Sequence, residues 1–191
     1  MGSAESNERD LVDLPRLEDV FKALRRGRHI CLRDGVLYQA VKSKADGFTD
    51  LFRQLGFELV HHPRDFFYFV DRGNFTELSS RMAVFMFVLI EDLADRGDPV
   101  EETLMTRRFR VADLPHLVGD RYRRLMREAG VSTPADLDHA LRTMERFGFC
   151  ERLPDDSFAF RPPTYRFLDL CLDMATDAPH TEEASAEEEA P

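Results

Sequence analysis

Adjacent carboxylates are the first residues of this chain whose types and spacing could do chemistry. Glu101-Glu102 and Asp155-Asp156 are pairs of the kind that general acid–base catalysis uses. Both pairs are expected to lie in exposed turns. An exposed turn does not supply the perturbing environment that a carboxyl group needs for general acid–base catalysis, so we interpret both pairs as parts of solvated loops. The chain also lacks the G-x-S-x-G, G-x-x-x-x-G-K-[ST] and G-x-G-x-x-G motifs. The sequence therefore predicts a protein that is not an enzyme.

Histidines and cysteines could bind a metal ion or act as nucleophiles. His61 and His62 are neighbours at an expected strand end, so their side chains should point to opposite faces of a sheet. His29-x-Cys31 lacks a second ligand pair at zinc-site spacing, and we interpret it as a packed histidine and a buried thiol. Three widely separated cysteines predict no disulfide framework and indicate a reducing, cytosolic compartment. We expect neither a metal nor another cofactor.

Arginines could bind the phosphates of DNA. Residues 107–127 contain seven arginines and two aspartates, a local net charge of +5. Guanidinium groups bind phosphate in a bidentate manner, so this stretch could contact a DNA backbone without reading its sequence. An arginine-rich solvated face, neutralised by nearby acids, explains the same residues equally well. The candidate DNA-binding residues are Arg107, Arg108, Arg110, Arg121, Arg123, Arg124 and Arg127.

Two similar halves are expected to position these residues. Apolar residues at helical spacing predict helices, and aromatic or β-branched runs around Pro/Asp turns predict hairpins. The first half is predicted to contain a helix from residue 17, a short apolar strand at 29–32, helices at 36–44 and 48–55, and strands at 57–61 and 66–70. The second half is predicted to contain a strand at 107–111, helices at 112–117, 122–129 and 135–147, strands at 149–152 and 158–161, and a helix at 164–174.

A long apolar helix is predicted between the halves, over residues 76–95. Asn74 or Thr76 can cap it, and Glu77 can complete a capping box from Asn74. Residues 82–90 are apolar on every side of the helix, so other elements must cover it from several directions. We therefore assign part of this helix to a domain or dimer interface, through Met82, Phe85, Met86 and Leu89.

The order of elements in each half is typical of a winged-helix domain. RQLGFELVHHPRDFFYF and ERFGFCERLPDDSFAF share a helix end, a Gly-Phe stop, a strand, a Pro/Asp turn and an aromatic strand. The predicted fold is mostly α with small β-hairpins, as tandem winged-helix domains. Its expected parts are a disordered N-terminus (1–13), an N-terminal domain with the long connecting helix (14–97), a C-terminal domain (98–174) and a disordered acidic tail (175–191).

The formal net charge of −10 argues against strong, non-specific attraction of the free chain to nucleic acid or anionic membranes. The excess lies at the ends, because residues 1–10 carry a net charge of −2 and residues 173–191 one of −7. The intervening body is nearly neutral, so DNA contact is not excluded, and we expect the acidic tail to limit promiscuous DNA binding. The longest apolar run has nine residues and the N-terminus is polar, which predicts neither a membrane span nor a signal peptide.

Three stretches of the chain together resemble the MksE family: RGRHICLRDGVLYQAV, the stretch from LGFELVHHPRDFFYF to VADLPHL, and YRRLMREAGV. These are the MukE-like (kite) subunits of bacterial MukBEF-type condensins. The resemblance implies a homodimer of tandem winged-helix chains, formed chiefly through the N-terminal domains. It also implies binding to a kleisin subunit (MksF) and, through the kleisin, to an SMC-type ATPase (MksB). Such complexes act on DNA in chromosome organisation and segregation or in plasmid defence, which implies a cytoplasmic, nucleoid-associated protein.

A free-standing winged-helix transcription regulator is the alternative interpretation. Such a protein binds a defined palindrome by itself, with a large ratio of specific to non-specific affinity. The net acidity of the chain and the lack of a markedly basic recognition helix favour the condensin subunit.

Overall fold

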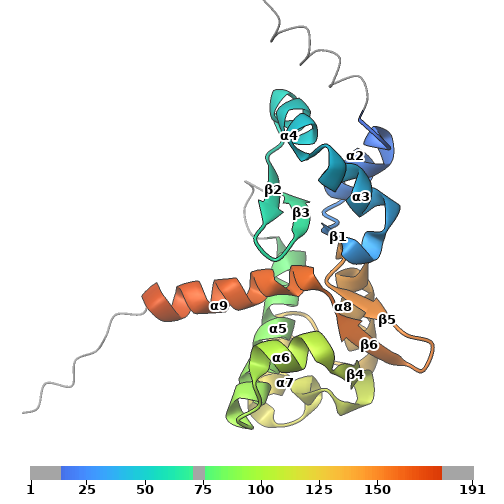
Figure 1. Cartoon of the computed structure of the whole chain (residues 1–191). Coiled ribbons are helices and arrows are strands. Elements are labelled where there is room, and N and C mark those ends of the chain that lie inside the picture. The colour runs from blue at the N-terminus through green and yellow to red at the C-terminus, as the bar shows by residue number, and fades with distance from the viewer. Residues whose placement is uncertain (1–13, 71–75, 178–191) are drawn as a thin grey trace, which may run out of the picture.

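Two three-stranded antiparallel sheets, each beside its own helices, organise the chain in a computed structural model that describes residues 14–70 and 76–177 (Figure 1). We call residues 14–70 the first unit and residues 76–177 the second unit. Their sheets have corresponding strand orders, β1-β3-β2 and β4-β6-β5, in which the last strand of each unit lies in the middle. The predicted mixture of helices with small β-hairpins is confirmed.

The first unit consists of a helical layer against one face of its sheet. Its elements are α2 (Leu17–Arg25), β1 (Ile30–Cys31), the 3-10 helix η1 (Leu32–Asp34), α3 (Val36–Ser43), α4 (Ala45–Gln54), β2 (Leu59–His62) and β3 (Phe66–Phe69). Val20, Phe48, Phe52 and Phe67 are buried together in its core. The helices pack through the apolar faces that their spacing predicts.

The hairpin of the first unit has a tighter loop than expected. His62 pairs with Phe66, so the loop has three residues rather than four. Asp65 ends the loop in the left-handed region with φ 60°. Its carboxylate accepts hydrogen bonds from Tyr38 and Lys42 of α3, which fixes the loop on its own unit and offsets the strain of that conformation.

The long helix α5 (Glu77–Asp95) packs into the second unit. Thr76 caps it, and Ser79, not Glu77, completes the capping box; Asn74 lies outside the described residues. The four residues that the sequence assigns to an interface are buried in the second core, beside elements that follow in the chain. These residues, Met82, Phe85, Met86 and Leu89, therefore pack inside one chain rather than forming its surface.

The second unit adds one helix to the predicted plan and divides another. Its elements after α5 are α6 (Val100–Thr106), β4 (Arg108–Arg110), η2 (Val111–Asp113), η3 (Pro115–Leu117), α7 (Asp120–Glu128), α8 (Pro134–Phe147), β5 (Cys150–Arg152), β6 (Ser157–Phe160), η4 (Pro162–Thr164) and α9 (Tyr165–Asp177). The single helix expected at 112–117 is wrong, because Pro115 forces Leu114 into an extended conformation between η2 and η3.

Helix α9 lies between the two units and projects to one side of the body (Figure 1). It continues to Asp177, three residues into the segment that the sequence assigns to the acidic tail; residues 178–191 lie outside the described part. Phe167 packs on Phe149 in the second core, with ring centroids 4.8 Å apart. Other side chains of α9 contact the sheet of the first unit, so this helix bridges the two units.

Candidate functional site

Strand β4 carries the first group of candidate DNA-binding arginines. Arg108 and Arg110 are exposed on either side of the buried Phe109, as the alternation of a half-buried strand requires. The Arg107 guanidinium lies 5.5 Å from the ring centroid of Phe109, which places it over the edge of the second core. A hollow of about 390 Å³ beside Arg110 is also lined by Asp113, Asp138, Arg152 and Asp156. Acidic side chains therefore accompany the basic ones at this strand.

Helix α7 carries the second group. Met126 is fully buried, while the four arginines of the helix are exposed on its other faces. Arg121 forms an ion pair with Glu91 of α5 at 2.5 Å. The other three form no ion pair with any residue that the structure describes, and their guanidinium groups are free to meet a phosphate: Arg123, Arg124 and Arg127.

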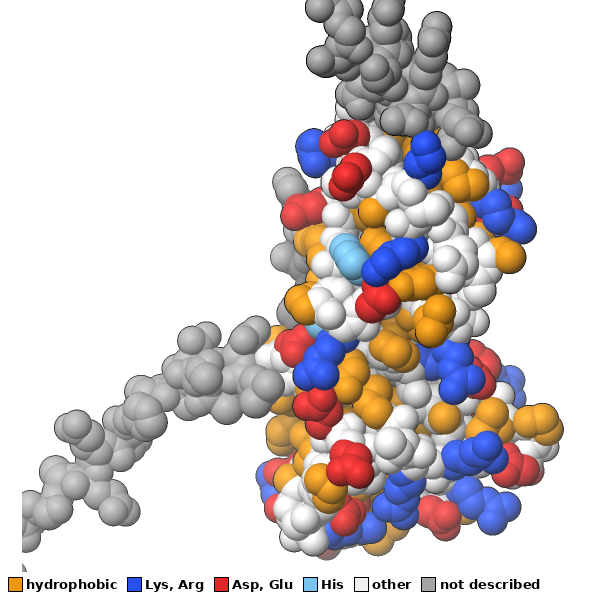
Figure 2. Space-filling model, in the orientation of Figure 1, with side chains coloured by type: hydrophobic (Ala, Val, Ile, Leu, Met, Phe, Trp, Pro, Cys, Tyr) orange, Lys and Arg blue, Asp and Glu red, His pale blue; other side chains and the backbone are white. Residues whose placement is uncertain are grey.

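The seven arginines lie on two different parts of the second unit. Strand β4 packs beside β6, whereas α7 packs on η3 and α5. Figure 2 shows basic and acidic side chains intermingled over the lower part of the molecule, where these elements lie. The stretch that is continuous in sequence therefore divides into a β4 group with acids nearby and an α7 group with three unpaired guanidinium groups.

The paired carboxylates have separate structural roles. Glu101 and Glu102 lie in the first turn of α6, not in the expected turn, and both are exposed. Negative charge at a helix N-terminus is favourable there. Asp155 lies in the β5–β6 loop as predicted, and its carboxylate accepts hydrogen bonds from the backbone and hydroxyl of Ser157. These bonds lower the pKa of Asp155 and stabilise the loop.

His61 and His62 point to opposite faces of the sheet, as predicted. His61 stacks on Phe67, on the face toward the first core, and bonds to Asp65. His62 stacks on Phe66, on the other face, and bonds across to Asp169 of α9 at 2.9 Å. Within residues 14–70 and 76–177, no group of three His, Cys, Asp or Glu side chains is placed to hold a metal ion.

A polar junction between the units is the main feature that sequence reasoning misses. The Asp34 carboxylate of η1 lies 2.7 Å from Arg161, and its other oxygen accepts from Arg28 at 2.6 Å. Arg161 also lies 3.2 Å from Sγ of Cys31, a thiol whose pKa is raised by burial. Asp34 and Arg161 are almost fully buried, which makes this a fixed connection rather than a surface ion pair.

The backbone of the two units is also joined beside this ion pair. His29 donates its backbone N–H to the carbonyl of Phe147 at 2.8 Å, and its ring accepts from Arg166 of α9 at 2.7 Å. Burial, and secondarily the Arg166 charge, lowers the pKa of His29 to about 3, so the ring is neutral at physiological pH. The Arg166 guanidinium also lies 4.2 Å from the ring centroid of Tyr68.

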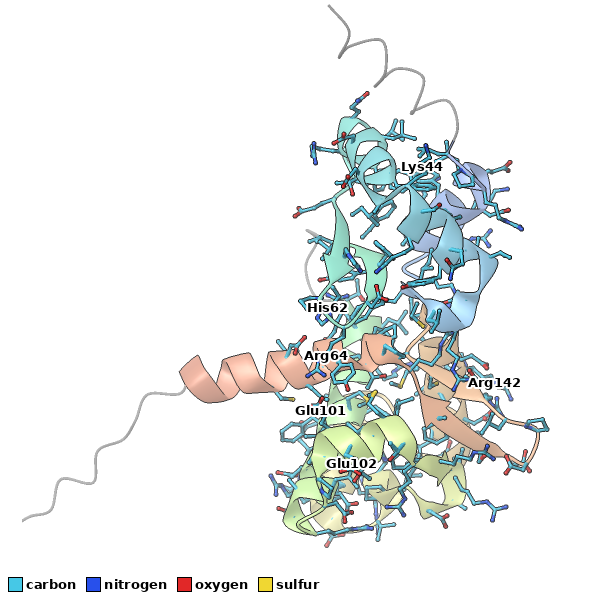
Figure 3. The ribbon with its side chains drawn as sticks, in the orientation of Figure 1. Lys44, His62, Arg64, Glu101, Glu102 and Arg142 are labelled. Carbon is cyan, nitrogen blue, oxygen red and sulfur yellow. The ribbon has the colours of Figure 1, made fainter. Side chains whose placement is uncertain are left out.

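The β2–β3 loop makes an outer contact with the second unit (Figure 3). Arg64 pairs with Glu101 at 2.9 Å and lies 4.2 Å from the ring centroid of Tyr165. The Tyr165 hydroxyl donates to the same carboxylate at 3.1 Å. This exposed contact joins the two units in addition to the buried junction.

No helix in the described part of the chain is long and apolar enough to cross a membrane. No curated protein matches the chain. The family model described as condensin complex protein MksE matches residues 15–172, which include both sheets and the junction between the units. The chain therefore belongs to the MksE family of condensin complex proteins.

Proposed function

We propose that this protein is a non-catalytic accessory subunit of an SMC–kleisin complex. The observation that carries the proposal is the family match over residues 15–172, because the family consists of condensin complex subunits and is not a family of enzymes. The structure is compatible with such a role, since its best-connected polar groups join the two units to each other. A subunit that links other proteins benefits from this kind of fixed geometry.

In the proposed complex, two copies of the chain form a homodimer and bind the kleisin. The kleisin connects the dimer to the SMC-type ATPase, which hydrolyses ATP. Both units have a helix before the first strand, further helices after it and a closing hairpin, which supports the assignment of tandem winged-helix domains. The complex acts in the cytoplasm, at the nucleoid, in chromosome organisation or plasmid defence.

The exposed arginines would hold DNA beneath the ATPase heads without reading its sequence. Arg123, Arg124 and Arg127 support this part of the proposal, because no carboxylate among the described residues neutralises them. Arg121 contributes less, since its guanidinium already pairs with Glu91. Phosphate contacts of this kind position a protein on DNA and weaken as salt rises.

Co-purification tests the proposed function. The tagged chain is expressed with the genes that neighbour its own, and the purified material is analysed by size-exclusion chromatography and mass spectrometry. We expect co-elution with a kleisin and an SMC-type ATPase. A chain that elutes without either partner, and that binds a defined DNA palindrome by itself, would instead identify a transcription regulator.

A further inference from the structure

The edge strands β2 and β5 occupy equivalent places in the two sheets. In β2, His61 lies opposite Phe67, the second residue of β3; in β5, Arg152 lies opposite Phe158, the second residue of β6. Val70 donates to the carbonyl of Glu58, which sets the hydrogen-bonding phase of the first hairpin. Backbone groups of alternate edge residues must then point away from the sheet. These are the groups of Leu59 and His61 in β2, and of Cys150 and Arg152 in β5.

In the second unit, a side chain accepts a hydrogen bond from one of the outward backbone N–H groups of β5. Glu145, near the end of α8, accepts the outward N–H of Arg152 at 3.0 Å. A capped donor cannot pair with another strand, so this edge is protected at Arg152. Glu145 stands three residues before Gly148, the glycine that ends α8 with φ 86°.

The first unit has the opposite chemistry at the same place. Arg53 stands three residues before Gly56, which has φ 81°, where the second unit has Glu145. An arginine cannot accept a hydrogen bond. Among the residues that the structure describes, none accepts the outward N–H of His61 or of Leu59, and no strand pairs with this side of β2.

A hollow lies beside this open edge. It has a volume of about 550 Å³ and is lined by Thr49 and Arg53 of α4 and by Gly56, Phe57, Glu58 and Leu59, so both a basic and an acidic side chain belong to its lining. The Arg53 side chain is 69% exposed and pairs only with Asp50, three residues earlier on the same helix, among the residues that the structure describes. Such a surface pair contributes little to stability, so a competing carboxylate can replace it.

We propose that the outer edge of β2 binds an extended segment of a partner polypeptide as a fourth strand. The backbone of the segment pairs with Leu59 and His61, a side chain of the segment enters the hollow, and an Asp or Glu side chain pairs with Arg53. Main-chain pairing would supply affinity, and the hollow and Arg53 would supply specificity. The inference rests on the proposed function only in naming a subunit of the complex as the natural source of the segment.

The first test needs no natural partner. A displayed library of random peptides of about ten residues, long enough to cover such an edge, is selected on the full-length chain. We expect extended binders that carry an acidic residue, and we expect these binders to slow amide hydrogen exchange at Leu59 and His61. Slow exchange of both amides in the free chain would mean that the chain covers its own edge and would overturn the inference.

Four variants separate the edge from its surroundings. His61→Pro removes the outward N–H, a position where an edge strand tolerates proline, whereas His61→Ala keeps it and removes only the ring. Arg53→Glu introduces the acceptor that the second unit has, and Arg142→Glu is its control on α8, where Arg142 is 65% exposed. His61→Pro and Arg53→Glu should weaken peptide binding at least about tenfold, and the two controls less than about twofold. Equal binding by His61→Pro and His61→Ala would contradict strand addition.

Titration with the kleisin distinguishes this inference from the proposed function. Kleisin binding that is lost in His61→Pro and Arg53→Glu supports both. A kleisin that binds all four variants equally, with no peptide selected at the edge, overturns the inference and leaves the proposed function standing. A kleisin that does not bind the unmodified chain, while acidic peptides still require the His61 N–H, overturns the proposed function alone.

Discussion

The carboxylate of Asp34 in the first unit lies 2.7 Å from the guanidinium of Arg161 in the second unit, with side-chain exposures of 5% and 7%. A buried ion pair of this kind adds little net stability, but the loss of one partner leaves an uncompensated buried charge. The pair therefore acts as a constraint on how the units are arranged. If the two units could change their positions relative to each other, these two charges would not stay buried away from water.

Replacing Asp34 with alanine should destabilise the folded chain. Arg161 would lose its carboxylate partner, and its Nε already has no hydrogen-bond partner among the described residues. The expected loss in the free energy of unfolding is about 3–5 kcal/mol, measured by urea denaturation. Asp50→Ala, which breaks the exposed pair with Arg53, should cost less than about 1 kcal/mol. Equal stabilities of these two variants would refute the constraint.

Gly148 is a second position where the two units are in close contact and where a substitution should destabilise the folded chain. It adopts φ 86°, and a Cβ atom there would lie 2.6 Å from the carbonyl oxygen of His29 in the other unit. Gly148→Ala should therefore combine backbone strain with a clash. Gly97→Ala isolates the strain, because Gly97 has φ 75° and a Cβ atom added there would meet no described atom within 4 Å. We expect Gly148→Ala to cost at least about 2 kcal/mol more than Gly97→Ala in thermal or urea unfolding.

Acid should destabilise the second unit through His116. This residue is fully buried, its Nε2 lies 2.8 Å from the Phe85 carbonyl oxygen, and its Nδ1 has no partner among the described residues. Burial lowers the pKa of His116 to about 4. A histidine in the unfolded chain has a pKa of about 6.5, so the unfolded state takes up the proton first as the pH falls.

The stability that neutral His116 contributes is complete above pH ~6.5 and is lost as the pH falls from ~6.5 to ~4, on the order of 3 kcal/mol. His116→Phe keeps an aromatic ring beside Phe85 and removes the titration. Urea denaturation at several pH values should show a weaker pH dependence for this variant than for the unmodified chain. Parallel pH profiles would exclude His116 as the source.

The unpaired arginines of α7 should dominate any DNA contact by the second unit. Reversing the charge of Arg123 and Arg124 should weaken low-salt DNA binding by the reconstituted complex at least about tenfold and reduce the salt dependence of the affinity by about two phosphate contacts. Arg121→Glu should have a smaller effect because Arg121 pairs with Glu91. Reversal of Arg107 and Arg108 tests the β4 group separately. Unchanged affinity in all of these variants would remove the DNA assignment.

Deletion of the acidic C-terminus should strengthen DNA binding by the free chain at low salt. Because α9 extends to Asp177, the truncation should remove residues 178–191 and leave the helix intact. Removing negative charge reduces repulsion of the DNA phosphates, and the effect should vanish at high salt. Fluorescence anisotropy with a labelled duplex measures both conditions. No difference at low salt would leave the segment without an electrostatic role.

Local signals explain the parts of the fold that could be predicted from the sequence. Thr133 caps α8, Pro134 begins it and Gly148 ends it, as these residue types indicate. The hairpins follow equally well, because each strand is close in sequence to its partner. Helix α6 is missed because only Leu104 of its seven residues is buried, which leaves no apolar periodicity.

Contacts between distant residues explain what could not be predicted. Asp34 and Arg161 are 127 positions apart, and neither the charge nor the neighbours of Asp34 identify which arginine it meets. The seven candidate arginines are close in sequence, yet β4 and α7 carry them to different parts of the unit. Met82 and Phe85 are covered, as their apolar surroundings in the helix predict, but their partners belong to the same chain.

Light scattering of the purified chain mixed with its kleisin tests most directly the proposal that this chain is a kleisin-binding subunit of an SMC complex. We expect a dimer of the chain by itself and one joint peak in the mixture, whose mass equals a dimer plus bound kleisin. Two separate peaks, each with the mass of its free component at concentrations well above about 10 μM, would contradict the proposal.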